Sequence, residues 1–308
     1  MNKKKIIIGS RGSKLAMLYA KNVRKNILSK NSDLNDNSIE MKLIKTSGDI
    51  HHSKRLSEIG GKGLFSKQIE EELLLEKIDI AVHALKDLPS IETPGLETKI
   101  FLKRNDPREV MITNGFNSIT KLKPNSIIGT SSFRRTAQIN FMRKDLVTKL
   151  IRGNVDTRIQ KLENHEYDAI ILAYAGIKIL GLEKKISQFF SFSEMLPSVG
   201  QGIIALQTRI NDEKIKSILK KVNDENTSRA AIAERSMLKT IEGDCDTAVG
   251  GLAIIEKDLI TLNCELFSLD GKKRFLTKTK GHISEANKIG IEAGKDLLKQ
   301  AGDNYKKR

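Results

Sequence analysis

The sequence predicts an α/β protein with two sheet-containing domains, followed by a small α+β domain. Over the first two thirds of the chain, short apolar runs alternate with segments of helical periodicity, and this alternation occurs twice. The last quarter instead consists of strand-like segments separated by turns. A chain of 308 residues is also longer than one ordinary core, because domains usually hold about 100 to 150 residues.

The first round of alternation contains three expected strands. KIIIG at 5–9 reads as a buried strand, and Ser13 is expected to cap the helix that follows. A second strand is expected at 41–47, and the glycine-rich GGKGLF at 60–65 opens another helix. The third strand, IDIAVHAL at 78–85, is continuously apolar, which is typical of strands that a parallel sheet buries on both faces.

The second round repeats the pattern with different residues. Strands are expected at 110–113, 126–130, 148–153 and 167–176. Helices are expected from SSFRR after the second of these and from NVDTR after the third. A further strand lies near 204, after LPSVGQG, and a helix follows at about 212–222.

The last part of the chain has a different pattern. A helix at about 227–242 precedes LAIIE, DLITLNCELFSL and KRFLTKTK, which are separated by the turn residues EKD and DGK. These segments predict a three-stranded meander, followed by a final helix at about 284–300.

The composition argues against several classes of protein. Lys and Arg outnumber Asp and Glu by 54 to 38, but aromatic residues make up only 5% and Trp is absent, so platforms for base stacking are scarce. No apolar run approaches the roughly 18 residues of a membrane helix, and MNKKKIIIGSRGS lacks the apolar core of a secretory signal. Two cysteines without a CxxC indicate a reducing compartment. We therefore expect a cytoplasmic protein that binds neither nucleic acid nor membranes.

Charged residues recur just after the expected strands. Arg11 follows the first strand, Lys86 and Asp87 follow IDIAVHAL, and the strands of the second round are followed by Arg134, Arg135, Arg152 and Arg158. Ligands of open α/β sheets bind beyond the carboxyl ends of the strands. Guanidinium groups gathered there would hold a ligand with several carboxylates or phosphates. Any one of these arginines taken alone is more often a solvated surface charge, and it is their shared position at strand ends that favours a binding site.

Asp87 has two interpretations. It could cap the turn in DLP, or it could pair with a cation that develops on a ligand in the arginine-lined crevice.

The two cysteines differ in their surroundings. Cys264 alternates with Ile260, Leu262 and Leu266 along one expected strand, which is the pattern of a core residue. Cys245, in IEGDCDTAVGG, has no such periodicity and is flanked by turn formers. A nucleophile or a covalent attachment point is the better alternative to a surface thiol there. The histidines show no metal-binding spacing, so no metal is expected.

The motifs of the chain resemble those of the porphobilinogen deaminase family. They run through nearly the whole length: GSRGSKLA, GGKGLFSKQIE, DIAVHALKDLP, NDPREV, IGTSSFRRTAQ, IRGNVDTRIQKL, YDAIILAYAGI, LPSVGQG and the Cys245 loop. The resemblance implies a hydroxymethylbilane synthase, a transferase of tetrapyrrole and haem biosynthesis. Such an enzyme condenses four porphobilinogen molecules head to tail, with loss of ammonia, and releases linear hydroxymethylbilane by hydrolysis. The alternative is a non-enzymatic two-domain anion-binding protein.

The family fold implies two α/β domains built like periplasmic binding proteins and a small C-terminal α+β domain. Domain 1 is expected at 1–102 with 200–222, domain 2 at 106–196, and domain 3, which carries the cofactor cysteine, at 225–308. A monomer is expected, with the active site in the cleft between domains 1 and 2.

The resemblance also implies roles for individual residues. A dipyrromethane cofactor is expected on Cys245 through a thioether, and Asp87 is expected to be catalytic and to contact pyrrole nitrogens. The residues expected at or near the cofactor are Lys86, Asp87, Ser132, Arg134, Arg135 and Asp49. Those expected to contact substrate or the growing chain are Arg11, Ser13, Arg152 and Arg158. Lys62 and Phe65 match the family's mobile loop over the cleft.

Three positions depart from the family pattern. Ile179 replaces a usual arginine, and Glu58 stands where some members have lysine. Asp244 replaces the small residue that usually precedes the cofactor cysteine, and its charge is expected to disfavour a thiolate at Cys245.

Overall fold

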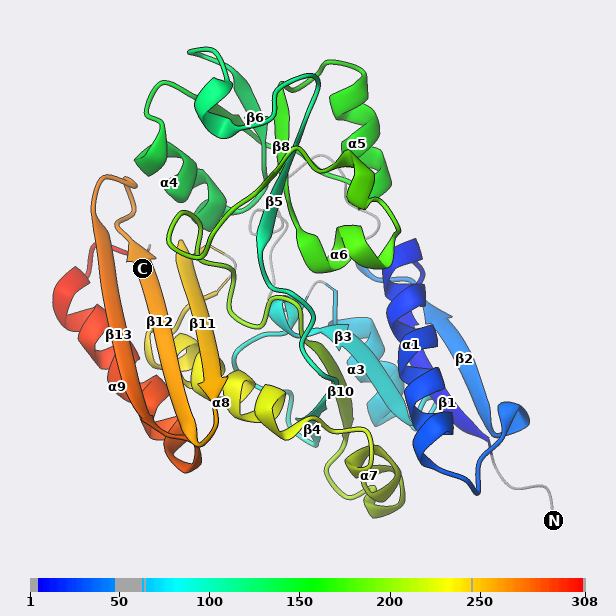
Figure 1. Ribbon diagram of the computed structural model, residues 1–308. Helices are drawn as coiled ribbons and strands as arrows, with labels where there is room; N and C mark the ends of the chain where they lie inside the picture. The colour runs from blue at the N-terminus through cyan, green and yellow to red at the C-terminus, as the bar shows by residue number, and fades with distance from the viewer. Residues whose placement is uncertain (1–4, 48–62, 64, 245, 307–308) are drawn as a thin grey trace. The chain divides into compact units, whose positions relative to one another are not determined.

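The computed structural model describes residues 5–47, 63, 65–244 and 246–306 (Figure 1). These residues form two compact units. Unit 1 comprises 5–47, 63, 65–105 and 203–228, and unit 2 comprises 106–202, 229–244 and 246–306. Within these ranges no helix combines the length and the apolar character that a membrane crossing requires.

Unit 1 is built on a five-stranded mixed sheet with the strand order β2-β1-β3-β10-β4. Its strands are β1 (Ile6–Arg11), β2 (Ile39–Ile44), β3 (Ile80–Ala84), β4 (Leu96–Phe101) and β10 (Ile204–Arg209). β1 is parallel to β2 and β3, whereas β10 is antiparallel to both of its neighbours. The carboxyl ends of β1 and β3 and the amino end of β10 therefore lie at the same edge of the sheet.

Helices cover both faces of this sheet. α1 (Lys14–Lys30) and α7 (Glu213–Lys220) pack with Ile80 in one core, and α3 (Lys67–Leu74) packs with Ala81 in another. Ile80 and Ala81 are neighbours on β3, so their side chains point to opposite faces of the sheet. β3 is therefore buried on both faces, as its continuously apolar sequence predicted.

Unit 2 contains a sheet with the same arrangement, in the order β7-β6-β8-β5-β9. Its strands are β5 (Glu109–Thr113), β6 (Ile127–Gly129), β7 (Val147–Lys149), β8 (Ala169–Ala173) and β9 (Gln188–Phe189), and its helices are α4 (Phe133–Met142), α5 (Val155–Glu163) and α6 (Tyr174–Ile179). β6 is parallel to β7 and β8, and β5 is antiparallel to its neighbours. In each sheet the inserted antiparallel strand is the first that the chain forms after passing from one unit to the other.

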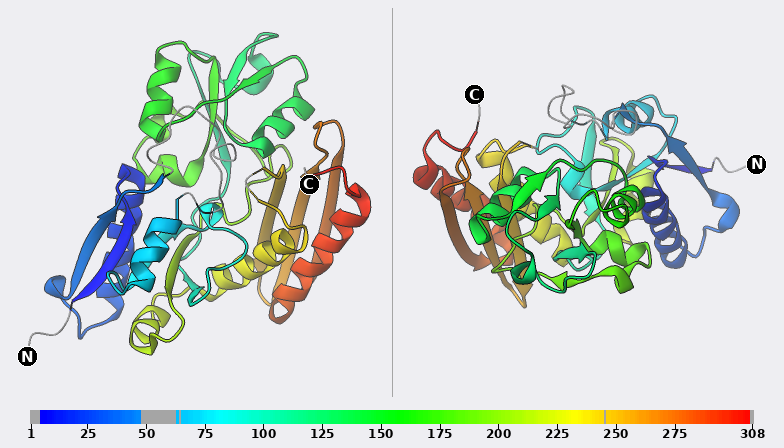
Figure 2. Two further views of the ribbon diagram at one scale, coloured as in Figure 1. Left: turned by 180° about the vertical axis from the view of Figure 1, so that it is seen from behind. Right: turned by 90° about the horizontal axis from the view of Figure 1, so that it is seen from above.

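The C-terminal residues form the predicted meander. β11 (Val249–Glu256), β12 (Leu259–Phe267) and β13 (Arg274–His282) are antiparallel in that order. α9 (Ala286–Ala301) lies along this sheet in every view (Figure 2), and it shares a core with the later turns of α8 (Glu225–Thr240). Cys264 is buried in this core, so its predicted packing role is confirmed.

The structure confirms the predicted fold class and corrects some elements. β4 and β9, the edge strands beside β10 and β5, were not predicted, and the strand expected at 148–153 is only the three-residue β7. Short 3-10 helices are η1 (Asp36–Ser38), η3 (Leu85–Asp87), η4 (Ile119–Lys121), η5 (Glu183–Lys185) and η6 (Ile283–Glu285).

Candidate functional site

Unit 1 brings two predicted site residues together at the carboxyl end of β1. Arg11 is the last residue of β1, and its guanidinium carbon lies 3.9 Å from the centre of the Phe65 ring. Phe65 precedes α3, so this cation-π contact links the end of a strand to the start of a helix. Ser13 caps α1, where its hydroxyl accepts a hydrogen bond from the Ala16 N–H at 3.3 Å.

Lys86 and Asp87 lie in η3, directly after β3. The Leu85 N–H donates to the Ile203 carbonyl at 3.0 Å, which ties this turn to the residue before β10. Leu85 and Leu88 are buried while the Asp87 side chain between them is exposed. The buried leucines therefore anchor a turn that presents the Asp87 carboxylate to solvent.

Two neighbouring residues were not singled out from the sequence. Burial, and then the Asp87 carboxylate, raise the pKa of Tyr19 on α1 to about 12, so Tyr19 remains a neutral hydrogen-bond donor. His83 on β3 is buried, and its Nε2 has no partner among the described residues. Burial lowers the pKa of His83 to about 4; Gln207 opposes this shift and the positive charge of Arg11 adds to it.

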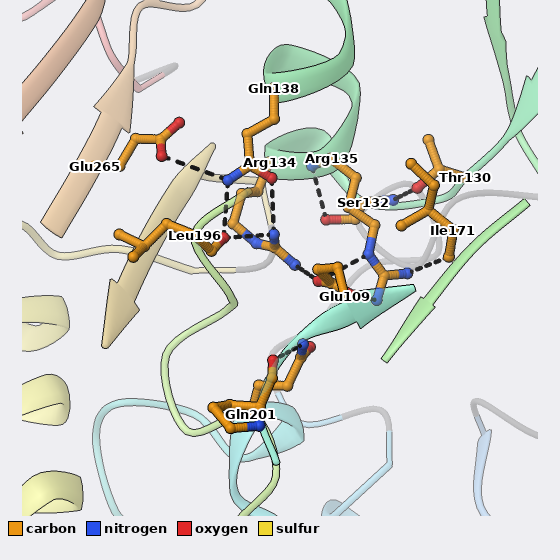
Figure 3. Close-up of polar contacts among 11 residues, drawn as sticks. Glu109, Thr130, Ser132, Arg134, Arg135, Gln138, Ile171, Leu196, Gln201 and Glu265 are labelled. Atoms are coloured by element: carbon orange, nitrogen blue, oxygen red, sulfur yellow. Dashed lines mark hydrogen bonds and ion pairs between the residues drawn. The ribbon is translucent and has the colours of Figure 1, made fainter. Parts of the chain in front are cut away.

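Unit 2 brings Arg134 and Arg135 together on one buried carboxylate, that of Glu109 (Figure 3). Glu109 Oε1 accepts from Arg134 Nη2 at 2.5 Å and from Arg135 Nε at 3.1 Å, and Oε2 accepts from Arg135 Nη2 at 2.8 Å. Glu109 is fully buried, and Arg134 and Arg135 are only 4% and 6% exposed. Glu109 was missed because it is a single acid at the start of an apolar strand, where the sequence does not reveal which cation it meets.

Further contacts fix both guanidinium groups. Arg134 Nη1 donates to Gln138 Oε1 and to the Leu196 carbonyl, each at 2.8 Å, and Arg135 Nη1 donates to the Ile171 carbonyl at 2.8 Å. Each arginine thus makes three hydrogen bonds within the described part of the chain, and a guanidinium carries five N–H donors. Two positive charges share one carboxylate, which leaves these three side chains with a net charge of about +1.

The N-terminus of α4 lies beside this cluster. Ser132 is the N-cap, and its hydroxyl accepts from the Arg135 N–H at 3.4 Å. The Ser132 N–H donates to Thr130 Oγ1 at 3.2 Å. The helix that begins here adds oriented N–H groups and a favourable dipole for an anion to the arginine pair.

The cluster continues to the C-terminal sheet. Gln138 Nε2 donates to the Leu196 carbonyl at 2.8 Å and reaches Glu265 Oε2 on β12 at 3.5 Å, and Arg274 Nη2 on β13 donates to the same oxygen at 3.1 Å. Gln201, fully buried, donates to the Pro107 carbonyl at 2.7 Å and so fixes the loop before β10 beside the entry to β5 (Figure 3).

Of the remaining predicted site residues, the structure describes Arg152 and Arg158. Arg152 is buried after β7, and Arg158 in α5 donates from Nε to the Gly153 carbonyl at 2.8 Å. Cys245, Asp49, Lys62 and the departure at Glu58 lie outside the described residues.

Asp244 is engaged within its own loop. Its Oδ1 accepts from Thr247 Oγ1 at 3.0 Å and from the Asp246 N–H at 3.1 Å, and its N–H donates to Thr247 Oγ1 at 3.1 Å. The carboxylate therefore bonds to both Asp246 and Thr247.

Family comparison agrees with these motifs over nearly the whole chain. Residues 6–217 match the family model described as porphobilinogen deaminase, dipyromethane cofactor binding domain, and residues 228–299 match the model of the porphobilinogen deaminase C-terminal domain.

Curated relatives match at similar length. Porphobilinogen deaminase of Syntrophomonas wolfei is 41% identical, over 96% of this chain and 95% of the relative. That of Syntrophobacter fumaroxidans is 38% identical over 97% and 96%, and that of Geobacillus kaustophilus is 40% identical over 96% and 94%. Among solved structures, a nutrient binding protein from Burkholderia cenocepacia is 10% identical with a TM-score of 0.44, over 76% of this chain and 94% of that one. On the family models and the curated relatives, the chain belongs to the porphobilinogen deaminase family.

Proposed function

We propose that this chain is a hydroxymethylbilane synthase that adds four porphobilinogen molecules, one at a time and with loss of ammonia, to a dipyrromethane carried on Cys245. The completed chain is then hydrolysed to linear hydroxymethylbilane. The family membership supports this activity, and it favours the enzyme over the anion-binding alternative. The observation that carries the proposal is the buried arginine pair at the strand ends of unit 2, because each pyrrole of the substrate bears two carboxylates.

The residues present suit a cofactor with several carboxylates. Among the residues that the structure describes, Arg134 and Arg135 share the Glu109 carboxylate and each keeps N–H donors beyond its three hydrogen bonds, and the N-terminus of α4 lies beside them. Arg134, Arg135, Ser132 and Lys86 would hold the cofactor carboxylates, with Asp49 nearby. When bound, the dipyrromethane supplies the terminal pyrrole carbon to which the first substrate is joined.

Asp87 is proposed as the catalytic residue. Its exposed carboxylate on η3 would accept a hydrogen bond from a pyrrole N–H and would stabilise the positive charge that develops as ammonia leaves. Arg11, Ser13, Arg152 and Arg158 would bind the carboxylates of the incoming substrate and the growing chain. Lys62 and Phe65 would belong to the loop that covers the site.

An intact-mass measurement tests the proposal. Protein purified from cells that make porphobilinogen should be heavier than its sequence by two linked pyrrole units, and Cys245→Ala should remove the excess. Cys264→Ala is the matched control, because Cys264 is buried and burial raises the pKa of its thiol, so this variant should keep the added mass. A wild-type mass equal to that of the bare chain would refute the cofactor assignment.

The setting of the enzyme is part of the same proposal. We place it in the cytoplasm as a monomer that acts on a small-molecule substrate, without nucleic acid or membrane partners. The division into 1–102 with 200–222, 106–196 and 225–308 remains our proposal for its three domains, the last of which would carry the cofactor.

A further inference from the structure

Glu109 accepts hydrogen bonds from both Arg134 and Arg135, and these three residues are called the cluster below. It is the first residue of β5 and pairs with Ala173 of β8 in the antiparallel ladder. Both of its carboxylate oxygens face guanidinium groups, and Arg135 binds them through Nε and Nη2 as a fork. The backbone at Glu109 is therefore held by the sheet, and the carboxylate sets the plane of the Arg135 guanidinium.

The remaining contacts restrict the arginines to one arrangement. Arg134 is held on one side by Glu109 and on the other by Gln138 and the Leu196 carbonyl. Arg135 is held by Glu109 and the Ile171 carbonyl. With three hydrogen bonds fixed for each, the directions of the other N–H donors are also fixed, because the guanidinium is planar.

The cluster of Glu109, Arg134 and Arg135 carries a net positive charge although its side chains are buried. A single carboxylate cannot neutralise two buried guanidinium groups, so the cluster retains positive charge where water is largely excluded. Glu265, also fully buried, lies one residue further away, beyond Gln138, and is itself bound by Arg274. A carboxylate that binds Arg134 and Arg135 would complete the neutralisation.

We infer that Glu109 is a positioning residue of the carboxylate-binding site: it holds Arg134 and Arg135 so that their remaining N–H donors receive the carboxylates of the dipyrromethane and of the growing pyrrole chain. This inference rests on the proposed function. Glu109 itself touches neither the cofactor nor the substrate; it acts through the two arginines.

Two variants of Glu109 test the inference. Glu109→Gln keeps the shape and removes the charge, so Arg135 loses its ionic fork. Glu109→Asp keeps the charge, but its side chain is shorter by one methylene, so the carboxylate lies further from the two guanidinium groups. Loss of a charged hydrogen bond corresponds to about 10- to 100-fold in affinity. We expect Glu109→Gln to raise KM for porphobilinogen by about that factor and to lower the fraction of protein that carries cofactor mass, with Glu109→Asp between it and wild type.

Glu70→Gln is the matched control. Glu70 is also a largely buried acid that accepts side-chain hydrogen bonds, from Gln207 Nε2 and Thr93 Oγ1, both at 2.9 Å. Its loss should lower the melting temperature without changing KM or cofactor loading. Each variant is measured by intact mass, by thermal unfolding, and by separate kcat and KM values for the loaded protein.

The outcomes separate the inference from the proposed function. If Glu109→Gln lowers only the melting temperature, as Glu70→Gln does, and keeps wild-type KM and loading, Glu109 is merely structural and the inference is wrong. If Glu109→Gln does not fold, Glu109→Asp decides, and wild-type KM and loading in that variant overturn the inference. A wild-type protein without the cofactor mass would instead refute the proposed function.

Discussion

The guanidinium of Arg11 packs over the ring of Phe65, with 3.9 Å between its central carbon and the ring centre. One residue ends the first strand of unit 1 and the other precedes α3, so two segments that are far apart in sequence meet at the edge of the sheet. Phe65 therefore orients a cation that is proposed to bind substrate.

Phe65→Leu should weaken substrate binding. The leucine keeps an apolar side chain but removes the ring face, and a cation-π contact of this kind contributes about 0.5 to 2 kcal/mol. We expect KM for porphobilinogen to rise roughly 2- to 30-fold. Phe65→Tyr keeps the ring face and is the control, with a KM near that of wild type. Equal KM values in wild type and Phe65→Leu would show that the contact does not orient Arg11.

Asp87→Asn should separate cofactor attachment from catalysis. The amide retains the size of the exposed side chain but cannot stabilise a developing cation, so ammonia release should fall by about 10²- to 10⁴-fold while the cofactor mass remains. Asp258→Asn, an exposed acid in the turn between β11 and β12, should release ammonia at the wild-type rate. Near-normal turnover of Asp87→Asn would remove Asp87 from the catalytic role.

His83 should make the folded state sensitive to mild acid. In the unfolded chain His83 takes up a proton below its ordinary pKa of 6.5, whereas in the folded protein burial keeps it neutral down to about pH 4. The unfolded state binds more protons in this window, so the free energy of unfolding falls as the pH drops from about 6.5 to 4, by about 3 kcal/mol for this group.

Urea unfolding of wild type and His83→Gln between pH 4 and 8 measures this contribution. The wild-type value should fall more steeply than that of the variant below pH 6.5, and the two curves should run parallel above it. A difference between the curves that does not change with pH would contradict the buried neutral state of His83.

Asp244 is expected to support cofactor attachment through the loop rather than oppose it through its charge. Asp244→Asn keeps an oxygen acceptor for Thr247 and Asp246, whereas Asp244→Ala removes it. Intact mass should show wild-type loading in Asp244→Asn and reduced loading in Asp244→Ala. Faster loading of apo protein in Asp244→Asn than in wild type would support the opposite view, that the carboxylate disfavours the thiolate.

Much of the fold was predictable because its signals are local. The continuously apolar β3, the meander and the core position of Cys264 follow from residue periodicity and turn residues. β9 was not predictable, because two residues carry no periodicity. β4 was missed because it is an edge strand beside β10 whose apolar pattern is interrupted by the exposed Lys99.

The site was predictable only in part. Strand ends indicated where Arg11, Asp87, Arg134 and Arg135 would lie, and the family resemblance supplied their proposed roles. The sequence did not indicate that Arg134 and Arg135 would be buried on one carboxylate, nor that Arg11 would stack on Phe65.

The sequence by itself determined most of the strands and helices, several buried faces and the family, since periodicity, turn chemistry and motifs all act between neighbours along the chain. Only the tertiary structure decided which charges meet. Glu109 reaches Arg134 and Arg135 because β5 is inserted antiparallel beside β8. Arg11 reaches Phe65 because β1 ends, and α3 begins, at the same edge of a sheet. The pairing of strands that lie far apart in the sequence decides which charged side chains meet, and the burial that this pairing creates decides how strongly those charges interact.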